Sequence, residues 1–146
     1  MEIGQNVYYN RVVWYDRNVD SPDNEVNREI LELKFGRDGV FVTADEDECL
    51  KAIKNSIKAT LIISGSCGQI LIPKITQLAP MKSLVGAIVF CSDVETHKSW
   101  QQNYITVAPH IVDYFPKAME HAGKIMLQAI SAPAYMFNVS FKRAPA

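Results

Sequence analysis

The sequence predicts an α/β fold: a five-stranded parallel sheet of order 2-1-3-4-5, covered by helices on both faces as a three-layer α/β/α sandwich. Five β-prone runs alternate with five segments of helical periodicity between residues 11 and 130, and such alternation favours parallel strands with right-handed crossovers. The third and fourth runs are almost entirely apolar, as expected for strands covered on both faces. These two strands are therefore expected at or near the centre of the sheet.

The strands are identified by runs of β-branched and aromatic residues that end in turn formers. The first run, RVVWY, ends in the turn-forming cluster DRNVDSPDN. The fifth run, YITVA, is the weakest and is expected near an edge of the sheet. The five strands are expected at residues 11–15, 39–44, 59–64, 84–92 and 104–108.

The helices are identified by apolar residues that recur every three or four positions and by signals at their ends. Ser21 is the expected N-cap of the first helix, Pro22 occupies its first position, and Gly36 ends it. The last helix is expected from about residue 113 to about residue 130. The face of the first helix that we expect to be buried carries Val26, Ile30 and Leu33.

The chain of 146 residues has the length and composition of one globular domain, with 48% hydrophobic and 21% charged residues. The α/β domain is expected to cover residues 1–130. Residues 131–146 are different, because Pro133 ends the helical pattern and residues 135–141 have strand-like character. This C-terminal extended segment is expected to be an edge strand, a partner-binding arm or a linker to something larger.

Charge and cysteine content exclude several classes of protein. A formal net charge of −1 with scattered basic residues argues against DNA or RNA as partners. No apolar run approaches the roughly 18 residues that span a bilayer, and the N-terminus lacks the pattern of a signal peptide. The expected location is cytoplasmic, without membrane attachment. Three cysteines without CxxC spacing predict free thiols and no metal site: Cys49, Cys67 and Cys91.

In parallel α/β sheets, ligands bind at the carboxyl ends of the strands, near the point where strand order reverses. The residues that follow the predicted strands are therefore the candidates for a ligand site. His97 and His121 fall in helical segments at no metal-ligand spacing and are expected on the surface. The ligand-binding candidates are Asp16, Ser64, Gly65, Ser66, Gly68 and Ser92.

The five strand–helix units over about residues 11–130 resemble the receiver domain of two-component response regulators, a flavodoxin-like family. The resemblance implies an acidic pair after strand one, a phosphoryl-accepting aspartate after strand three, a hydroxyl after strand four and a Lys-Pro pair after strand five. Asp16 matches one acid and Ser92 the hydroxyl, whereas residues 108–109 are Ala-Pro. Residues 64–66, Ser-Gly-Ser, stand where the aspartate is needed. The resemblance therefore implies a degenerate, or pseudo-, receiver without phosphoryl transfer.

Three other readings of the same residues remain open. Cys67 lies in a glycine-rich turn ahead of a helix, where a thiol pKa is lowered, and His110 could act as its base in a small-ligand or nucleotide-binding enzyme. The same turn, residues 64–68, could hold a phosphate on its backbone N–H groups. An unorthodox phospho-switch that uses Asp16 and Ser92 is a further possibility.

The function expected from the sequence is non-catalytic: a regulatory or interaction module without a cofactor. Its partner is expected to be a protein or another domain of a longer chain, and a homodimer is possible. Trp14 and Trp100 are expected to be packing residues, because aromatic residues dominate core burial, although Trp100 is also a candidate for partner binding. The partner-binding candidates are Trp100, Tyr104, Tyr135 and Phe137, which lie in or near the fourth helix, the fifth strand and the tail.

Overall fold

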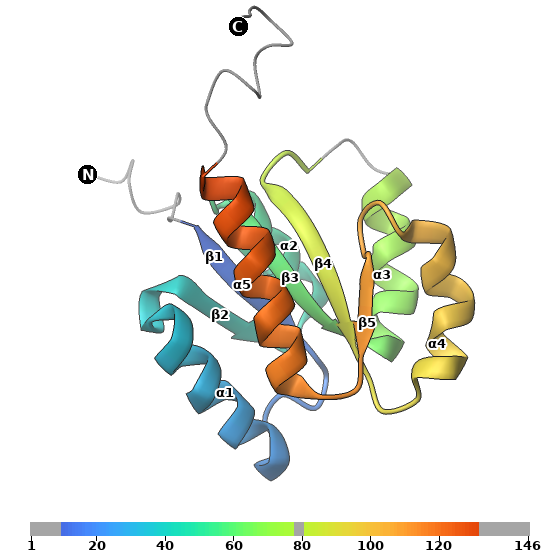
Figure 1. Ribbon diagram of the computed structural model, residues 1–146, viewed down its shortest axis with the longest axis horizontal. Helices are drawn as coiled ribbons and strands as arrows, with labels where there is room; N and C mark the ends of the chain where they lie inside the picture. The colour runs from blue at the N-terminus through green and yellow to red at the C-terminus, as the bar shows by residue number, and fades with distance from the viewer. Residues whose placement is uncertain (1–9, 78–80, 132–146) are drawn as a thin grey trace, which may run out of the picture.

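The computed structural model describes residues 10–77 and 81–131 (Figure 1). These residues form five parallel strands in the order β2-β1-β3-β4-β5, which confirms the predicted fold class and strand order. The strands are β1 (Arg11–Tyr15), β2 (Val40–Thr43), β3 (Ala59–Ser64), β4 (Leu84–Phe90) and β5 (His110–Val112). The helices are α1 (Pro22–Phe35), α2 (Glu46–Lys54), α3 (Gly65–Gln77), α4 (Val94–Gln101) and α5 (Phe115–Ser131), with 3-10 turns η2 (Arg37–Gly39) and η3 (Gln102–Tyr104).

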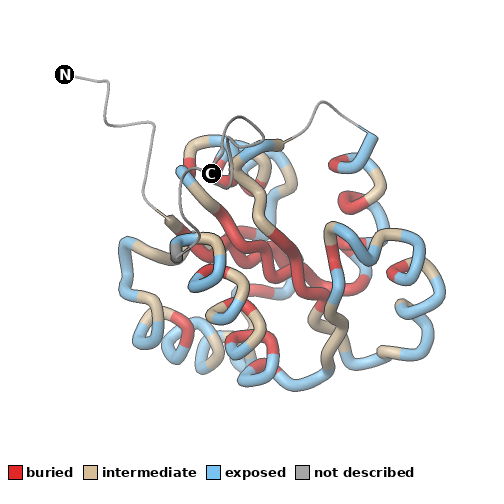
Figure 2. The backbone as a smooth tube through the Cα atoms, turned by 45° about the horizontal axis from the view of Figure 1, so that its top comes forward, coloured by how far each residue is buried: buried red, intermediate tan, exposed pale blue. Residues whose placement is uncertain are grey.

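The sheet separates two hydrophobic clusters, one beneath α1 and α5 and one beneath α2, α3 and α4. Figure 2 shows that the central strands are buried, whereas the outer sides of the helices are exposed. Trp14 of β1 is fully buried, as expected, and its ring lies 4.7 Å from that of Phe115 at the start of α5. Leu61 of β3 is also fully buried, but it packs in the cluster on the opposite side.

Helix α1 has the predicted ends but the wrong face was predicted to be buried. Ser21 is the N-cap, Pro22 begins the helix, and Gly36 ends it with a φ of 81° that favours glycine. The fully buried residue of α1 is Leu31, and Phe35, one turn later, packs against the same cluster. The predicted core residues are exposed instead: Val26 by 57%, Ile30 by 39% and Leu33 by 85%.

Strand β5 also differs from the prediction, because the run at residues 104–108 is not a strand. The backbone N–H groups of Val107 and Ala108 both donate to the carbonyl of Tyr104, so the chain turns there after α4 and η3. The side-chain amide of Gln101 holds the turn by donating to the Ala108 carbonyl at 2.6 Å. The strand begins at His110, and its carboxyl end is Val112.

The described residues end with α5 at Ser131. The tail candidates Tyr135 and Phe137 lie outside the described residues. Within the part of the chain that the structure describes, no helix combines the length and the apolar character needed to cross a membrane.

Candidate functional site

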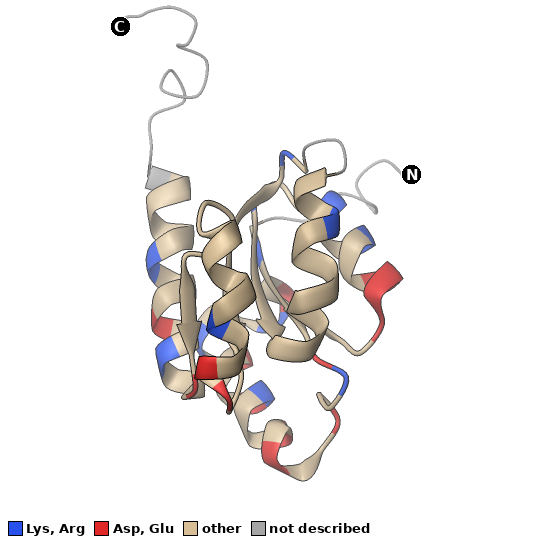
Figure 3. Ribbon diagram, turned by 90° about the vertical axis from the view of Figure 1, so that its right-hand side faces the viewer, with Lys and Arg blue, Asp and Glu red and all other residues tan. Residues whose placement is uncertain are grey.

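A cavity of about 570 Å³ opens at the carboxyl ends of the strands, where the fold class predicts a ligand site. Its lining comes from the residues that follow β1, β3, β4 and β5, from the first turn of α1 and from α4. In Figure 3 the acidic residues of these segments gather at the lower end of the molecule. None of the lining residues is a lysine or an arginine. Four of them are aspartates: Asp16, Asp23, Asp93 and Asp113.

Asp16 is the most buried carboxylate of this cavity. It follows β1 directly, and its backbone N–H donates to the Thr43 carbonyl at 3.1 Å, which ties it to the end of β2. Only 7% of the residue is exposed. Burial raises the pKa of its carboxyl, and a hydrogen bond from the Asn18 backbone N–H, 2.8 Å long, acts in the opposite direction. No cationic side chain contacts it among the described residues.

The segment after β3 enters α3 without the loop that the sequence suggested. The helix begins at Gly65, so that Cys67 lies in its first turn. The Ser64 hydroxyl accepts a hydrogen bond from the Cys67 N–H at 3.3 Å, which satisfies one free donor of the helix start. That N–H is therefore not available to a phosphate. Ser64, Gly65 and Ser66 line the cavity, whereas Gly68 does not.

The two glycines of this segment have a packing role. A Cβ added at Gly65 would lie 2.5 Å from Cδ2 of His97, closer than real Cβ contacts. A Cβ added at Gly68 would lie 3.0 Å from Cη2 of Trp100. The glycines thus allow α4 to approach the first turn of α3, and they explain the glycine-rich sequence without a phosphate.

His97 is one of the cavity residues that the sequence reasoning missed, because it was expected on the surface. It is half-buried and lines the cavity above Gly65. The indole N–H of Trp100 donates to its Nδ1 at 2.9 Å, so the neutral ring carries its proton on Nε2. The spacing His-x-x-Trp on one helix face, opposite two glycines, is the signal that could have identified this contact.

Cys67 and His110, the pair that the enzyme reading requires, lie on opposite faces of the sheet. Cys67 is 1% exposed and belongs to the cluster beneath α2, α3 and α4. Cys67 lies beside Tyr15 in this cluster. The pKa of the Tyr15 hydroxyl is raised to about 12, first by burial and then by the Cys67 thiol. His110 instead stacks on His121 of α5, with ring centroids 3.8 Å apart. The structure therefore does not bring the two candidate groups together.

The ends of β4 and β5 supply the rest of the lining. Ser92 is exposed at the cavity, as the ligand prediction requires. The carboxylate of Asp93 caps α4, because it accepts from the Thr96 N–H at 3.2 Å and from the Thr96 hydroxyl at 2.6 Å. These bonds hold the pKa of Asp93 below its usual value. Asp113 follows β5 and was missed because that strand was placed too early.

The predicted partner residues in α4 and η3 are less accessible than expected. Trp100 and Tyr104 are half-buried, and both pack against the cluster beneath α2, α3 and α4. Trp100 is further occupied by its hydrogen bond to His97. The packing role that the sequence also allowed for aromatic residues therefore accounts for Trp100.

The chemistry of the cavity follows from these groups. Carboxylates, hydroxyls and one imidazole N–H can bind a hydroxylated or cationic molecule, but four aspartates without a lysine or arginine oppose a phosphate. Among the described residues, no group of three or more His, Cys, Asp or Glu side chains is arranged to hold a metal ion. The lining thus provides contacts for a ligand but no evident nucleophile–base pair.

Comparison with known proteins adds no assignment. No family model matches the sequence, and a search of the curated proteins finds no significant match. The fold and the residues of the strand-end cavity are therefore the basis for the function proposed next.

Proposed function

We propose that this chain is a non-catalytic, receiver-like module that acts through contacts with proteins or with other domains of a longer chain. The observation that carries the proposal is the chemistry of the strand-end cavity. Ser64, Gly65 and Ser66 follow β3, at the place where a receiver needs its phosphoryl-accepting aspartate. Asp113, rather than a lysine, follows β5.

The hydroxyls at this place lack an activating base. A serine nucleophile needs a neighbouring group that can accept its proton. His97 is the imidazole of the cavity, but its Nδ1 already accepts from Trp100 and its Nε2 holds the proton. Ser64 in turn caps α3 through the Cys67 N–H. These contacts favour a structural role for both residues.

Ligand binding at the same cavity is the second candidate, and the cavity volume favours it. Its enzymatic form, with Cys67 as a nucleophile, has a direct test. Because Cys67 is buried and Cys91 is half-buried, a thiol-reactive probe near neutral pH is expected to label Cys91 first. Rapid labelling that disappears in Cys67→Ser would favour the enzyme over the proposed module.

The proposal is tested by phosphoryl transfer from acetyl phosphate in the presence of Mg²⁺. The intact mass of the full chain is expected to stay unchanged, while a receiver with a complete acidic set, in the same reaction, gains a phosphoryl group. A gain that Asp16→Asn or Ser92→Ala abolishes would contradict the proposal and support the unorthodox phospho-switch.

A further inference from the structure

An apolar groove of about 470 Å³ opens at the amino ends of the strands, at the opposite end of the sheet from the strand-end cavity. We call it the amino-end groove. It lies between the end of α3, the start of β4 and the turn that precedes β5. The eight described residues that line it are uncharged, and five of them are apolar with large side chains: Ile75, Met81, Leu84, Val85 and Val107.

The apolar residues of the amino-end groove are covered on one side only. Met81, Leu84 and Val107 pack against the cluster beneath α2, α3 and α4, yet each of them is only half-buried. Val85 is also half-buried, and Ile105, which is close to the groove in the sequence, is 54% exposed. An apolar surface left open in this way is a mark of an interaction site. The described residues therefore leave room for a further apolar layer here.

One wall of the groove is the edge of a strand. The first pair between β4 and β5 joins Ile88 to His110, so residues 84–87 of β4 lie ahead of the described part of β5. The backbone N–H of Ala87 donates to the Val107 carbonyl at 2.8 Å. Ahead of Ala87, no described strand pairs with β4 on this side. A segment in extended conformation can lie along such an edge.

The sequence after α5 has the pattern of a segment that suits this groove. Apolar and other residues alternate in residues 135–141, which lie outside the described part of the chain. Strict alternation indicates an extended segment with one apolar face, and that face needs an apolar surface to cover it. The residues of this apolar face are Tyr135, Phe137, Val139 and Phe141.

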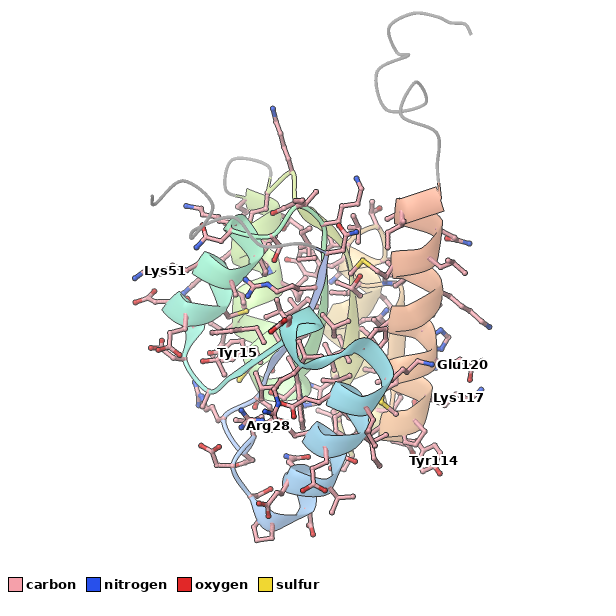
Figure 4. All side chains as sticks on the ribbon, turned by 90° about the vertical axis from the view of Figure 1, so that its left-hand side faces the viewer. Tyr15, Arg28, Lys51, Tyr114, Lys117 and Glu120 are labelled. Atoms are coloured by element: carbon pink, nitrogen blue, oxygen red, sulfur yellow. The ribbon has the colours of Figure 1, made fainter. Side chains whose placement is uncertain are left out.

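Helix α5 leads the chain to the end of the molecule that carries the groove. Tyr114, just before α5, lies at the lower end of the molecule in Figure 4, and α5 runs from there to the opposite end. Figure 1 shows the end of α5 and the start of β4 at this same end. A Cβ added at Gly86, which lines the groove, would lie 3.3 Å from Cγ2 of Ile125 in α5. The last turns of α5 therefore lie close to the groove.

The distance from α5 to the groove is within reach of residue 135. Ser131 follows Ile125 by six residues, which is about 9 Å along the helix axis. Pro133 favours an extended conformation for the residue before it and prevents the helix from continuing. The four residues from Ser131 to Tyr135 span up to about 13 Å when extended. The apolar face can therefore enter the groove of its own chain.

We infer that residues 135–141 dock in extended conformation in the amino-end groove of the same chain, with their apolar face against Leu84, Val85 and Val107. A short tether gives the segment an effective concentration on the order of millimolar, which favours it over the same segment of another chain. The inference goes beyond the proposed function, because it assigns a second surface at the other end of the sheet. A protein partner then reaches Tyr135 and Phe137 only by displacing the segment.

Hydrogen exchange of the full chain, read by mass spectrometry, tests the inference. The amides of residues 135–141 are expected to exchange at least about tenfold more slowly than those of a free peptide of the same sequence. Phe137→Asp is expected to remove this protection, because it places a charge in an apolar groove. Asn138→Asp is the matched control, since it adds the same charge at the next position, on the other face of the segment.

A substitution in the groove tests where the segment docks. Thr106 lines the groove and is exposed, so Thr106→Asp adds a carboxylate there without entering the core. This variant is expected to lower the protection of residues 135–141 at least about fivefold. Asn103→Asp is its control, because Asn103 is also exposed, in η3, and is not among the lining residues. Circular dichroism checks that both variants keep the fold.

Three results would overturn the inference. The first is exchange of residues 135–141 at the rate of the free peptide. The second is protection that Thr106→Asp leaves unchanged, because the segment would then dock elsewhere. The third is protection that rises with protein concentration, because a second copy would then supply the contact. None of these results alters the acetyl phosphate assay, which concerns the strand-end cavity and tests the proposed function separately.

Discussion

The α3–α4 pair and the α1–α5 pair differ in how far their large side chains are packed against the neighbouring helix. At α3 and α4, Gly65 and Gly68 make room for His97 and Trp100. These two large side chains are hydrogen-bonded to each other. At α1 and α5, a Cβ added at Gly123 would meet only the ends of Lys34 and Phe35, at ordinary distances of 3.5 and 3.9 Å, and several apolar residues of both helices remain exposed. The large side chains of α4 are thus packed against α3, whereas several large apolar side chains of α1 and α5 remain exposed to solvent.

The largest expected effect on stability is a difference between substitutions on the buried and the exposed side of α1. Leu31 is fully buried and Leu33 is 85% exposed on the same helix. Leu31→Ala is expected to lower the free energy of unfolding by about 2–5 kcal/mol, because it leaves a cavity in the core. Leu33→Ala is expected to change it by less than about 0.5 kcal/mol.

Urea denaturation of both variants, at a concentration where the chain is monomeric, makes the measurement. Equal losses from Leu31→Ala and Leu33→Ala would show that Leu33 is buried within the monomer. The side of α1 that carries Leu33 would then be part of the core, and the contrast between the two helix pairs would fail.

The next effect concerns the contact between α3 and α4. Gly65→Ala places a methyl group against the His97 ring, which Trp100 holds in position. Overpacking of this kind is expected to cost about 1–3 kcal/mol of unfolding free energy. Gly39→Ala is the control, since its Cβ would meet only Cβ of Phe35 at an ordinary 3.8 Å.

A double-mutant cycle sharpens this prediction. In a His97→Ala background, Gly65→Ala is expected to cost much less, because the ring that its methyl group meets is absent. The free energies of unfolding come from chemical denaturation of the four chains. An unchanged cost would mean that His97 does not confine Gly65.

The smallest effect is the pH dependence that Asp16 adds at the strand-end cavity. Burial raises its pKa above the ordinary 3.8, so the folded state favours the protonated form. Below that ordinary pKa the carboxyl is protonated in both states and costs nothing; as the pH rises through the folded pKa, stability is lost. Asp16→Asn keeps an oxygen acceptor for the Asn18 N–H and removes this cost.

Denaturation near pH 7 and near pH 3 checks the direction. The Asp16→Asn variant is expected to be more stable than the wild type at the higher pH and equal to it at the lower one. Lower stability at the higher pH would mean that a bound cation or a partner group compensates the ionised carboxylate.

Local sequence signals were enough to predict most of the strands and helices and their order. Strands β1 and β3 match the predicted residues, and the ends of α1 follow from Ser21, Pro22 and Gly36. The error at β5 arose because the β-prone run after Tyr104 also fits a turn, and the amide of Gln101 stabilises that turn. Propensity alone could not decide between these two structures, since a contact to the end of α4 decides it.

The cavity was harder to predict because its geometry depends on contacts between separate elements. The position of Asp16 follows from the end of β1 alone. That of His97 depends on how closely α3 and α4 approach, which the glycines of one helix and the aromatic rings of the other determine together. Likewise, helical periodicity shows two apolar stripes on α1, and only the packing of Leu31 tells which one faces the sheet.

The two outermost strands have a consequence for aggregation. Strand β5 pairs with β4 over three residues, and β2 pairs with β1 over four. Such short edge strands present few unpaired backbone groups to an incoming strand. Natural proteins use short edge strands to resist sheet extension. Lateral growth of the sheet into larger β-assemblies is thereby discouraged at both edges that the structure describes.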